Sequence, residues 1–249
     1  MPFPVVEFYN IRYNICKIKN KLIGSSGVYA LLEFLLFMLF SVLESCALFF
    51  LAFKIFKIDL YEKEIIFASI IMGGFSYVLR NNYNLPEVDV LLQYLLVFCF
   101  FWLLFRIQVF YATIMTAMAY QAFLLIQSVL YLLMKMSGIY ELQYPILSFG
   151  TYLLQFISSI LTLCIGYYIG TKRKGSDFVP DKPDGSINIS GRDKIMFILT
   201  LPSPFFTLFM LFSAKHLFEF FSLIPIFYAV LLFGYLYLSN KKDLDKHDY

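Results

Sequence analysis

Residues 28–53 read VYALLEFLLFMLFSVLESCALFFLAF, and their only charged side chains are Glu33 and Glu44. A transmembrane helix needs about 20 predominantly apolar residues, because each residue advances the helix by about 1.5 Å. This stretch is long enough to cross a bilayer. It is also much longer than the apolar part of a cleavable signal peptide, which has roughly 7–15 residues. It therefore predicts a first transmembrane helix.

The segment before this helix differs in character. Residues 1–26 are expected to form a basic, partly amphipathic N-terminal segment, and no convincing small-residue cleavage site follows them. We expect the segment to stay attached to the mature chain. Its basic residues are Arg12, Lys17, Lys19 and Lys21.

The composition of the whole chain favours a protein embedded in lipid. Of its 249 residues, 60% are hydrophobic, 20% are aromatic and only 15% are charged. Soluble domains average about 25% charged residues, and a soluble fold of this length cannot bury so much apolar surface. The net charge of +3 is also too small for a nucleic-acid-binding surface. These numbers exclude a soluble enzyme, a nucleic-acid-binding module and a disordered chain.

Six further apolar segments follow the first, so we expect an all-α, polytopic membrane protein with six to seven transmembrane helices in one bundle. The bundle would cover residues 27–240, with a polar loop at 171–194 and a short polar tail at 241–249. The six segments are 65–79, 88–105, 109–134, 144–169, 195–212 and 217–238.

Two of these segments need comment. The segment at 65–79 is short and contains Gly73 and Gly74, so whether it crosses the membrane is left open. The apolar block from 90 to 134, which begins just after Asp89, is too long for one crossing. We expect it to fold as a tight helical hairpin at Arg106, since antiparallel helices can be joined by about 2–5 residues.

The distribution of basic residues predicts an orientation in the cell membrane. Short loops rich in Lys and Arg stay in the cytoplasm. With seven spans, the larger share of these residues falls on the side that holds the 171–194 loop and the C-terminus. We therefore expect a cytoplasmic C-terminus, although the basic residues before the first span favour the opposite orientation.

Glu33 and Glu44 are the clearest candidates for a ligand-binding or proton-binding role. They are eleven residues apart, which places them within about 20° of each other around a helix and about 16 Å apart along it. Ionisable groups inside a span are costly and are functional hypotheses by default. The alternative is structural: each carboxyl group is protonated or hydrogen-bonded to a neighbouring helix.

Other polar residues in the spans have simpler interpretations. Amide side chains within spans commonly form hydrogen bonds between helices, and charged residues at span ends reach the interface or form ion pairs. The amides are Gln93, Gln121, Gln127 and Gln155, and the candidates for pairing or interface contacts are Arg80, Arg106 and Glu219.

Three prolines lie inside the last two predicted spans, namely Pro202, Pro204 and Pro225. Proline removes a backbone donor and bends a helix, which membrane bundles tolerate where neighbouring groups satisfy the freed carbonyls. These residues are hinge candidates, and packing geometry is the simpler explanation.

No catalytic pattern is visible in the sequence. Its two histidines, His216 and His247, lie outside any HExxH motif, and GxSxG and Walker motifs are missing. The four cysteines form no CxxC pair, so we interpret them as small apolar residues. We expect no enzyme activity, no metal and no cofactor.

Several short motifs resemble a known family. Residues 41–48 (SVLESCAL) precede an amphipathic exit at 53–58 (FKIFKI), and a second segment ends in SYVLR at 76–80. Residues 84–86 (NLP) follow, and a long apolar segment then closes on LFRI at 104–107. This order resembles the N-terminal membrane-sensor region of Gram-positive sensor histidine kinases of the quorum-sensing type.

The resemblance covers about residues 35–140 and implies a sensor or receptor module. It carries over two polar positions, Glu44 and Arg80. It does not extend to a kinase domain, because the chain stops at Tyr249. The resemblance therefore implies signalling through a separate membrane or cytoplasmic partner, within the lipid bilayer and without nucleic acid. A homodimer is a further option.

Three alternatives are kept beside the sensor interpretation. The chain could be the membrane subunit of a small-molecule transporter, with the carboxylates binding substrate or protons. It could be a membrane protein that confers immunity to a bacteriocin, which needs no chemistry of its own. An intramembrane protease is least favoured, because its paired catalytic residues are missing from the sequence.

Overall fold

The computed structural model describes residues 26–83, 85–137, 149–172, 175, 191–200 and 223–247. Every regular element in these ranges is helical, so the expected all-α class is confirmed for this part of the chain. The chain divides into two compact units, Met1–Phe37 and Met38–Tyr249. The boundary falls inside the first helix, and the packing described below belongs to the second unit.

The helices follow the predicted segments closely. The predicted loop at 171–194 and the predicted span at 195–212 lie mostly outside the described residues. The predicted tail at 241–249 is helical as far as His247. The elements are α2 (Ser26–Ile55), α3 (Glu62–Tyr77), η1 (Val78–Asn82), α4 (Pro86–Cys99), η2 (Phe100–Leu104), α5 (Val109–Met136), α6 (Phe149–Thr171), α7 (Gly191–Thr200) and α9 (Leu223–His247), where η marks a π-helical turn.

Three of the described helices are long and apolar enough to cross a membrane. They are Leu31–Ile55 with 25 residues, Val109–Met136 with 28 and Gly150–Thr171 with 22. Shorter apolar helices lie at Val88–Leu104 and Pro225–Tyr237. The lengths and composition of these helices are compatible with insertion into a membrane.

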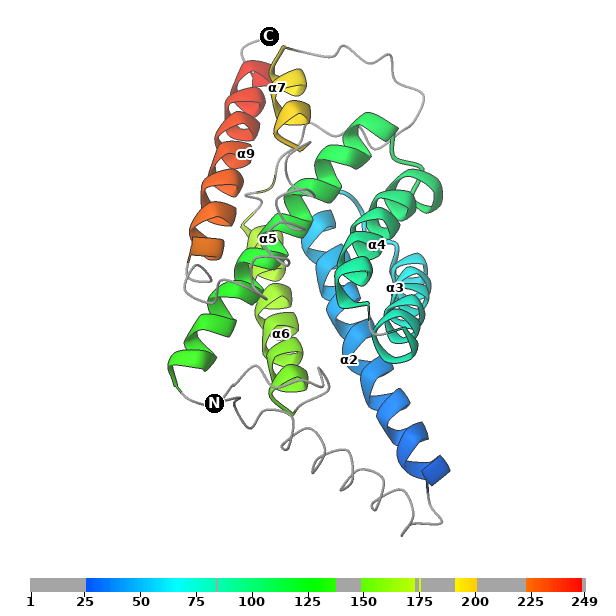
Figure 1. Cartoon of the computed structure of the whole chain (residues 1–249). Helices are drawn as coiled ribbons and strands as arrows, with labels where there is room; N and C mark the ends of the chain where they lie inside the picture. Colours follow the sequence, from blue (N-terminus) through cyan, green and yellow to red (C-terminus); the bar gives the residue numbers. More distant parts are fainter. Residues whose placement is uncertain are drawn as a thin grey trace, which may run out of the picture. The chain divides into compact units, whose positions relative to one another are not determined.

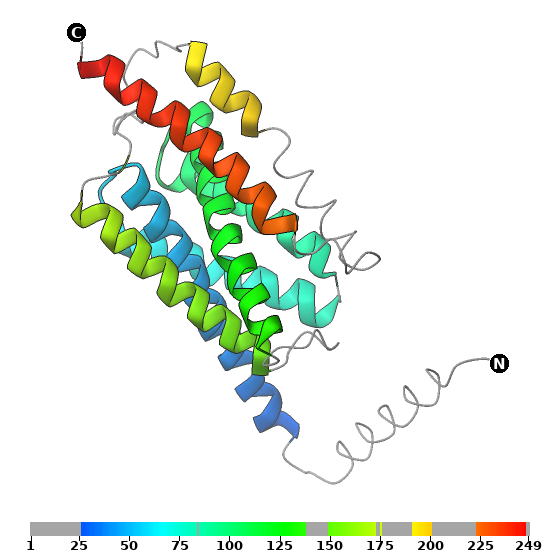
Figure 2. The same ribbon diagram turned by 90° about the vertical axis from the view of Figure 1, so that its left-hand side faces the viewer.

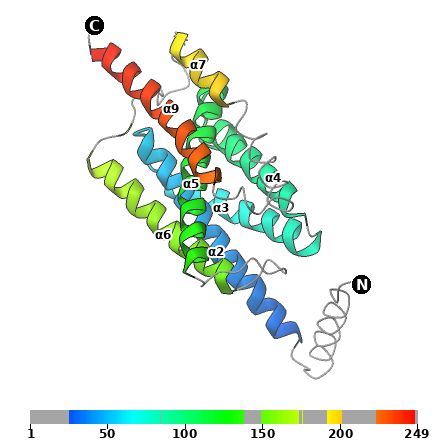
Figure 3. The ribbon, with the colours of Figure 1, turned by 60° about the vertical axis from the view of Figure 1, so that its left-hand side comes forward.

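Helix α5 is the centre of the second unit. It contacts α4, α6, α7 and α9, while α3 contacts α4 and α7 contacts α9 (Figure 1). From Met38 onward, α2 lies beside α6 (Figure 2 and Figure 3). The buried stretch of α5 is rich in small residues, among them Ala112, Ala117 and Ala119. Small side chains let neighbouring helices approach closely, which explains why one helix can contact so many others.

A cluster of aromatic rings fills the space between the end of α2 and η2, the π-helical turn that follows α4. The Phe101 ring lies edge-on to the rings of Phe49 and Phe53, with centroids 5.5 and 5.9 Å apart, and Phe105 lies 4.9 Å from Phe53. Edge-to-face contacts at these distances are favourable beyond simple burial. Phe49, Phe53 and Phe101 are completely buried.

Two short connections turn through residues with positive φ. Lys57, at 52°, lets the Ile58 N–H donate to the Phe53 carbonyl and so closes the end of α2. Arg106, at 54°, lies in the connection between η2 and α5, where the Ile107 N–H donates to the Phe101 carbonyl. Only residues 105–108 separate these two elements, so the predicted tight connection at Arg106 is confirmed.

Gly166 allows α6 to approach α2 closely. A Cβ atom at this position would lie 2.9 Å from Cδ1 of Phe50 and 3.4 Å from the Cα of Leu51. A larger side chain must therefore push the two helices apart, and overpacking of this kind typically costs about 1–3 kcal/mol.

We expect Gly166→Leu to lower the free energy of unfolding by about 1–2 kcal/mol. Titration with a denaturing detergent, followed by circular dichroism, measures this change. Gly74→Leu is the matched control, because a Cβ placed there has no atom within 4 Å beyond its chain neighbours and the backbone of its own helix. Equal losses in the two variants would contradict the close contact.

Candidate functional site

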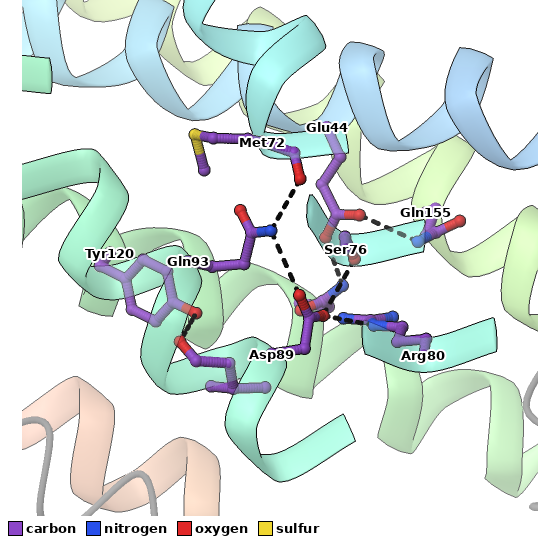
Figure 4. Close-up of polar contacts among 10 residues, drawn as sticks. Glu44, Met72, Ser76, Arg80, Asp89, Gln93, Tyr120 and Gln155 are labelled. Carbon is purple, nitrogen blue, oxygen red and sulfur yellow. Dashed lines mark hydrogen bonds and ion pairs between the residues drawn. The ribbon is translucent and has the colours of Figure 1, made fainter. Parts of the chain in front are cut away.

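Polar side chains from α2, α3, η1, α4, α5 and α6 meet inside the second unit. Figure 4 shows that Glu44, Asp89 and Arg80 point toward one another between the helices. We call this group the polar network. Its members are Glu44, Ser76, Arg80, Asp89, Gln93, Gln127 and Gln155.

Glu44 forms one half of the polar network. Its Oε1 accepts a hydrogen bond from Nε2 of Gln127 in α5, at 3.0 Å. Its Oε2 accepts one from Nε2 of Gln155 in α6, also at 3.0 Å. The carboxylate therefore ties α2 to two other helices, with a neutral amide on each oxygen.

Asp89 is the centre of the other half and is completely buried. Its Oδ2 accepts hydrogen bonds from Oγ of Ser76, at 2.9 Å, and from Nε of Arg80, with which it forms an ion pair. Its Oδ1 accepts one from Nε2 of Gln93, at 3.2 Å. The same amide nitrogen donates to the Met72 carbonyl, at 2.9 Å. Three side chains thus surround one buried carboxylate and connect α4 to α3 and η1.

The sequence places these groups by simple helical spacing. Ser76 and Arg80 are four residues apart, as are Asp89 and Gln93, so each pair projects from one helix face. The two helices are joined by a short connection, and Pro86 lies at the first turn of α4, where proline is tolerated. The two pairs therefore face each other across this connection.

Arg80 lies in the π-helical turn η1, and its side chain is 25% exposed, whereas that of Asp89 is 0% exposed. Single π-helical turns are rare in proteins, but those that are found lie frequently at functional sites. The ion pair thus joins a completely buried residue, Asp89, to a residue with a partly exposed side chain, Arg80. Arg80 also interacts electrostatically with Glu44, which links the two halves of the network.

Tyrosine rings border the polar network on the side of α4 and α5. The Tyr120 hydroxyl donates to the Val90 carbonyl, at 3.3 Å, and its ring lies edge-on to Tyr94, with centroids 5.3 Å apart. Tyr120 also interacts electrostatically with Asp89 and Glu44. It is the titratable group that α5 contributes beside the network.

The predicted site residues have different outcomes. Glu44 and Arg80 both belong to the polar network. Glu33 was expected to share an inward face with Glu44, but it is exposed and lies in the first compact unit. Arg106 is exposed in the connection that precedes α5.

The remaining predicted positions lie at or beyond the edges of the described residues. Pro225 is buried in the first turn of α9, where proline breaks no helical hydrogen bond, and its hinge role stays a prediction. Pro202, Pro204 and Glu219 lie outside the described residues.

The interpretation of the glutamines as links between helices is confirmed at three positions. Gln93, Gln127 and Gln155 each donate to a group on another helix. Gln121 is the exception: it is completely buried, and neither of its amide atoms has a hydrogen-bond partner.

Sequence reasoning missed Asp89, the most connected residue of the network. The residue was treated only as the boundary of an apolar block. The available signal was the spacing of Arg80, Asp89 and Gln93 across a short connection that ends at Pro86. That pattern places an acid opposite a base on two helices that follow each other in the chain.

The chemistry of the described residues is that of charge pairing and hydrogen bonding. In this part of the chain, no three His, Cys, Asp or Glu side chains gather in a way that could hold a metal ion. Cys46 donates from its Sγ to the Ser69 hydroxyl, at 3.3 Å, in a contact between α2 and α3.

Comparisons of the chain with protein-family models, curated proteins and solved structures find no match.

Proposed function

We propose that the chain is a membrane-embedded sensor or receptor that signals through a separate partner protein. The observation that supports this proposal is the polar network, in which charged and amide side chains join successive helices. A network of this kind fixes one arrangement of helices while its hydrogen bonds are satisfied. A signal that breaks or rearranges these bonds would change how the helices pack.

The position of Arg80 supports the same proposal. Its side chain is partly exposed and is paired with the completely buried carboxylate of Asp89, so a change at the surface can affect the interior through this one side chain. Conversion of the π-helical turn that carries Arg80 to α-helical geometry would turn the side chain to another direction. Two discrete arrangements of one element are what a switching protein requires.

The proposal includes a multi-pass topology of six to seven spans in the cell membrane, with a cytoplasmic C-terminus. It is supported by the three long apolar helices and by the helical runs Glu62–Asn82 and Val88–Leu104. The run at 62–82 combines 16 residues of α3 with 5 of η1, which is about the length of one crossing.

Reporter fusions test the topology. We expect a reporter that is active only in the cytoplasm to be active after Tyr249 and within the loop near Gly185. A reporter active only outside the cell should be active in the hairpin near Asn82. Activity of the Tyr249 and Gly185 fusions on opposite sides would contradict the seven-span arrangement.

Gene expression tests the signalling role in cells that encode the protein. Deletion is expected to change a limited set of transcripts, which the wild-type gene restores and Arg80→Gln does not. Arg106→Gln is the matched control, because Arg106 is also basic but exposed, and it should restore the set. An unchanged transcript profile in the deletion strain, or restoration by Arg80→Gln, would count against the proposal.

The half-buried position of Glu44 inside an apolar helix favours a second candidate function, the membrane subunit of a small-molecule transporter. A carboxylate within a span is a common site for substrate or proton binding in transporters. Loss of uptake of a defined nutrient on deletion and in Glu44→Gln, with no change in the transcripts described above, would favour transport over signalling.

A further inference from the structure

The polar network contains more carboxylates than cations. Its charged members in the described ranges are Glu44, Asp89 and Arg80, which interact electrostatically. Arg80 forms an ion pair with Asp89, and Asp89 also accepts hydrogen bonds from Ser76 and Gln93. If both carboxyl groups are ionised, one negative charge is left over between the helices.

That extra charge belongs to Glu44, whose two oxygens face the neutral amides of Gln127 and Gln155. Among the described residues, the titratable or charged groups that interact electrostatically with Glu44 are Arg80, Asp89 and Tyr120. From residue 149 to residue 171, α6 contains no Asp, Glu, Lys, Arg or His.

The position of Glu44 along the helix makes the extra charge costly. The residue lies near the middle of the apolar stretch Leu31–Ile55, which is long enough to span a membrane. A charged side chain near the centre of a bilayer is strongly unfavourable unless it is paired. Binding of a single proton removes this cost without moving any helix.

The partners of Glu44 suit a proton better than a metal ion. An amide can donate or accept a hydrogen bond, so a protonated Glu44 can donate to Gln155 once that amide turns over. Both protonation states then keep two hydrogen bonds. A metal ion would need several oxygen ligands, so both amides that face Glu44 with their nitrogens would have to turn over, whereas a proton requires only one of them to do so.

We propose that Glu44 is a proton-binding site at the contact of α2, α5 and α6. One bound proton brings the net charge of the polar network to zero. Gain or loss of this proton changes the hydrogen bonds that hold α2 to the other two helices. The proposal requires only that α2 lies in the membrane, so it stands apart from the signalling role.

Infrared difference spectroscopy of the full chain in phosphatidylcholine liposomes tests the site during a pH titration. We expect a band from the C=O stretch of a protonated carboxyl group that appears and disappears with pH. Labelling of the protein with ¹³C-glutamate should shift this band, and labelling with ¹³C-aspartate should not. A band that shifts only with aspartate, or the lack of any titrating band, would overturn the proposal.

Variants locate the proton on one residue. Glu44→Gln should abolish the band, because glutamine copies the shape of the protonated acid without its proton. Glu62→Gln, at an exposed position at the start of α3, should leave the band unchanged.

Retention of the full band in Glu44→Gln would refute the assignment. Dependence of the band on sodium at fixed pH would also refute it, because an alkali cation would then be the ligand. If Glu44→Gln does not fold, the isotope labels decide between the outcomes.

Discussion

Replacement of Asp89 by leucine is expected to lower the free energy of unfolding by about 3–5 kcal/mol, the usual cost of removing one partner from a buried ion pair. The loss is large because Asp89 is completely buried and accepts hydrogen bonds from three side chains. Without it, the guanidinium of Arg80 stays largely buried without its ion-pair partner, and the hydroxyl of Ser76 loses its acceptor.

The matched experiment removes both members of the pair. Replacement of a buried ion pair by apolar residues is often neutral, so the double variant Arg80→Leu/Asp89→Leu should recover more than half of the loss. Denaturation in mixed detergent micelles, followed by circular dichroism, measures the double variant and the single variants Arg80→Leu and Asp89→Leu. A double variant as unstable as the sum of the two single variants would show that the ion pair does not couple these positions.

Truncation of Phe101 to alanine is expected to cost about 2–3 kcal/mol. Lipid is as apolar as a phenylalanine side chain, so transfer out of water contributes little to helix association in a membrane. The loss comes from the cavity, at about 24 cal/mol for each Å³ that stays empty, and the ring leaves roughly 100 Å³. The site cannot collapse easily, because Phe101 is completely buried and in contact with the rings of Phe49, Phe53 and Phe105.

The next residue supplies the control for this prediction. Trp102 lies in the same π-helical turn, but 43% of it is exposed. Trp102→Ala should change the free energy of unfolding by less than about 0.5 kcal/mol, as expected for surface positions. The same unfolding assay compares the two variants. A larger loss for Trp102→Ala than for Phe101→Ala would contradict the described packing.

The helices can be predicted from the sequence because each one corresponds to a continuous run of mainly apolar residues. The apolar run at 28–53 becomes α2 at Ser26–Ile55, and the run at 109–134 becomes α5 at Val109–Met136. The charge at Arg106 interrupts one long apolar block, which predicts the position of a connection. These signals are local and need no knowledge of which helices are neighbours.

The partners within the candidate site could not be predicted in this way. The spacing of Glu33 and Glu44 places them on one helix face, but it does not say where along that face other helices begin to cover it. Asp89 was missed for a related reason: its role depends on Arg80, which lies on another helix. Helical periodicity describes one helix at a time, whereas an ion pair is a property of two.

The two halves of the polar network also differ in how much of the chain must be synthesised before their hydrogen bonds can form. Asp89 lies 13 residues after Ser76 and 9 after Arg80, so its bonds can form once α3 and α4 have emerged from the ribosome. The hydrogen-bond partners of Glu44 are synthesised much later, because Gln127 follows it by 83 residues and Gln155 follows it by 111. The bonds between α3 and α4 can therefore form early, whereas the carboxyl group of Glu44 has both of its partners only after α6 has been made.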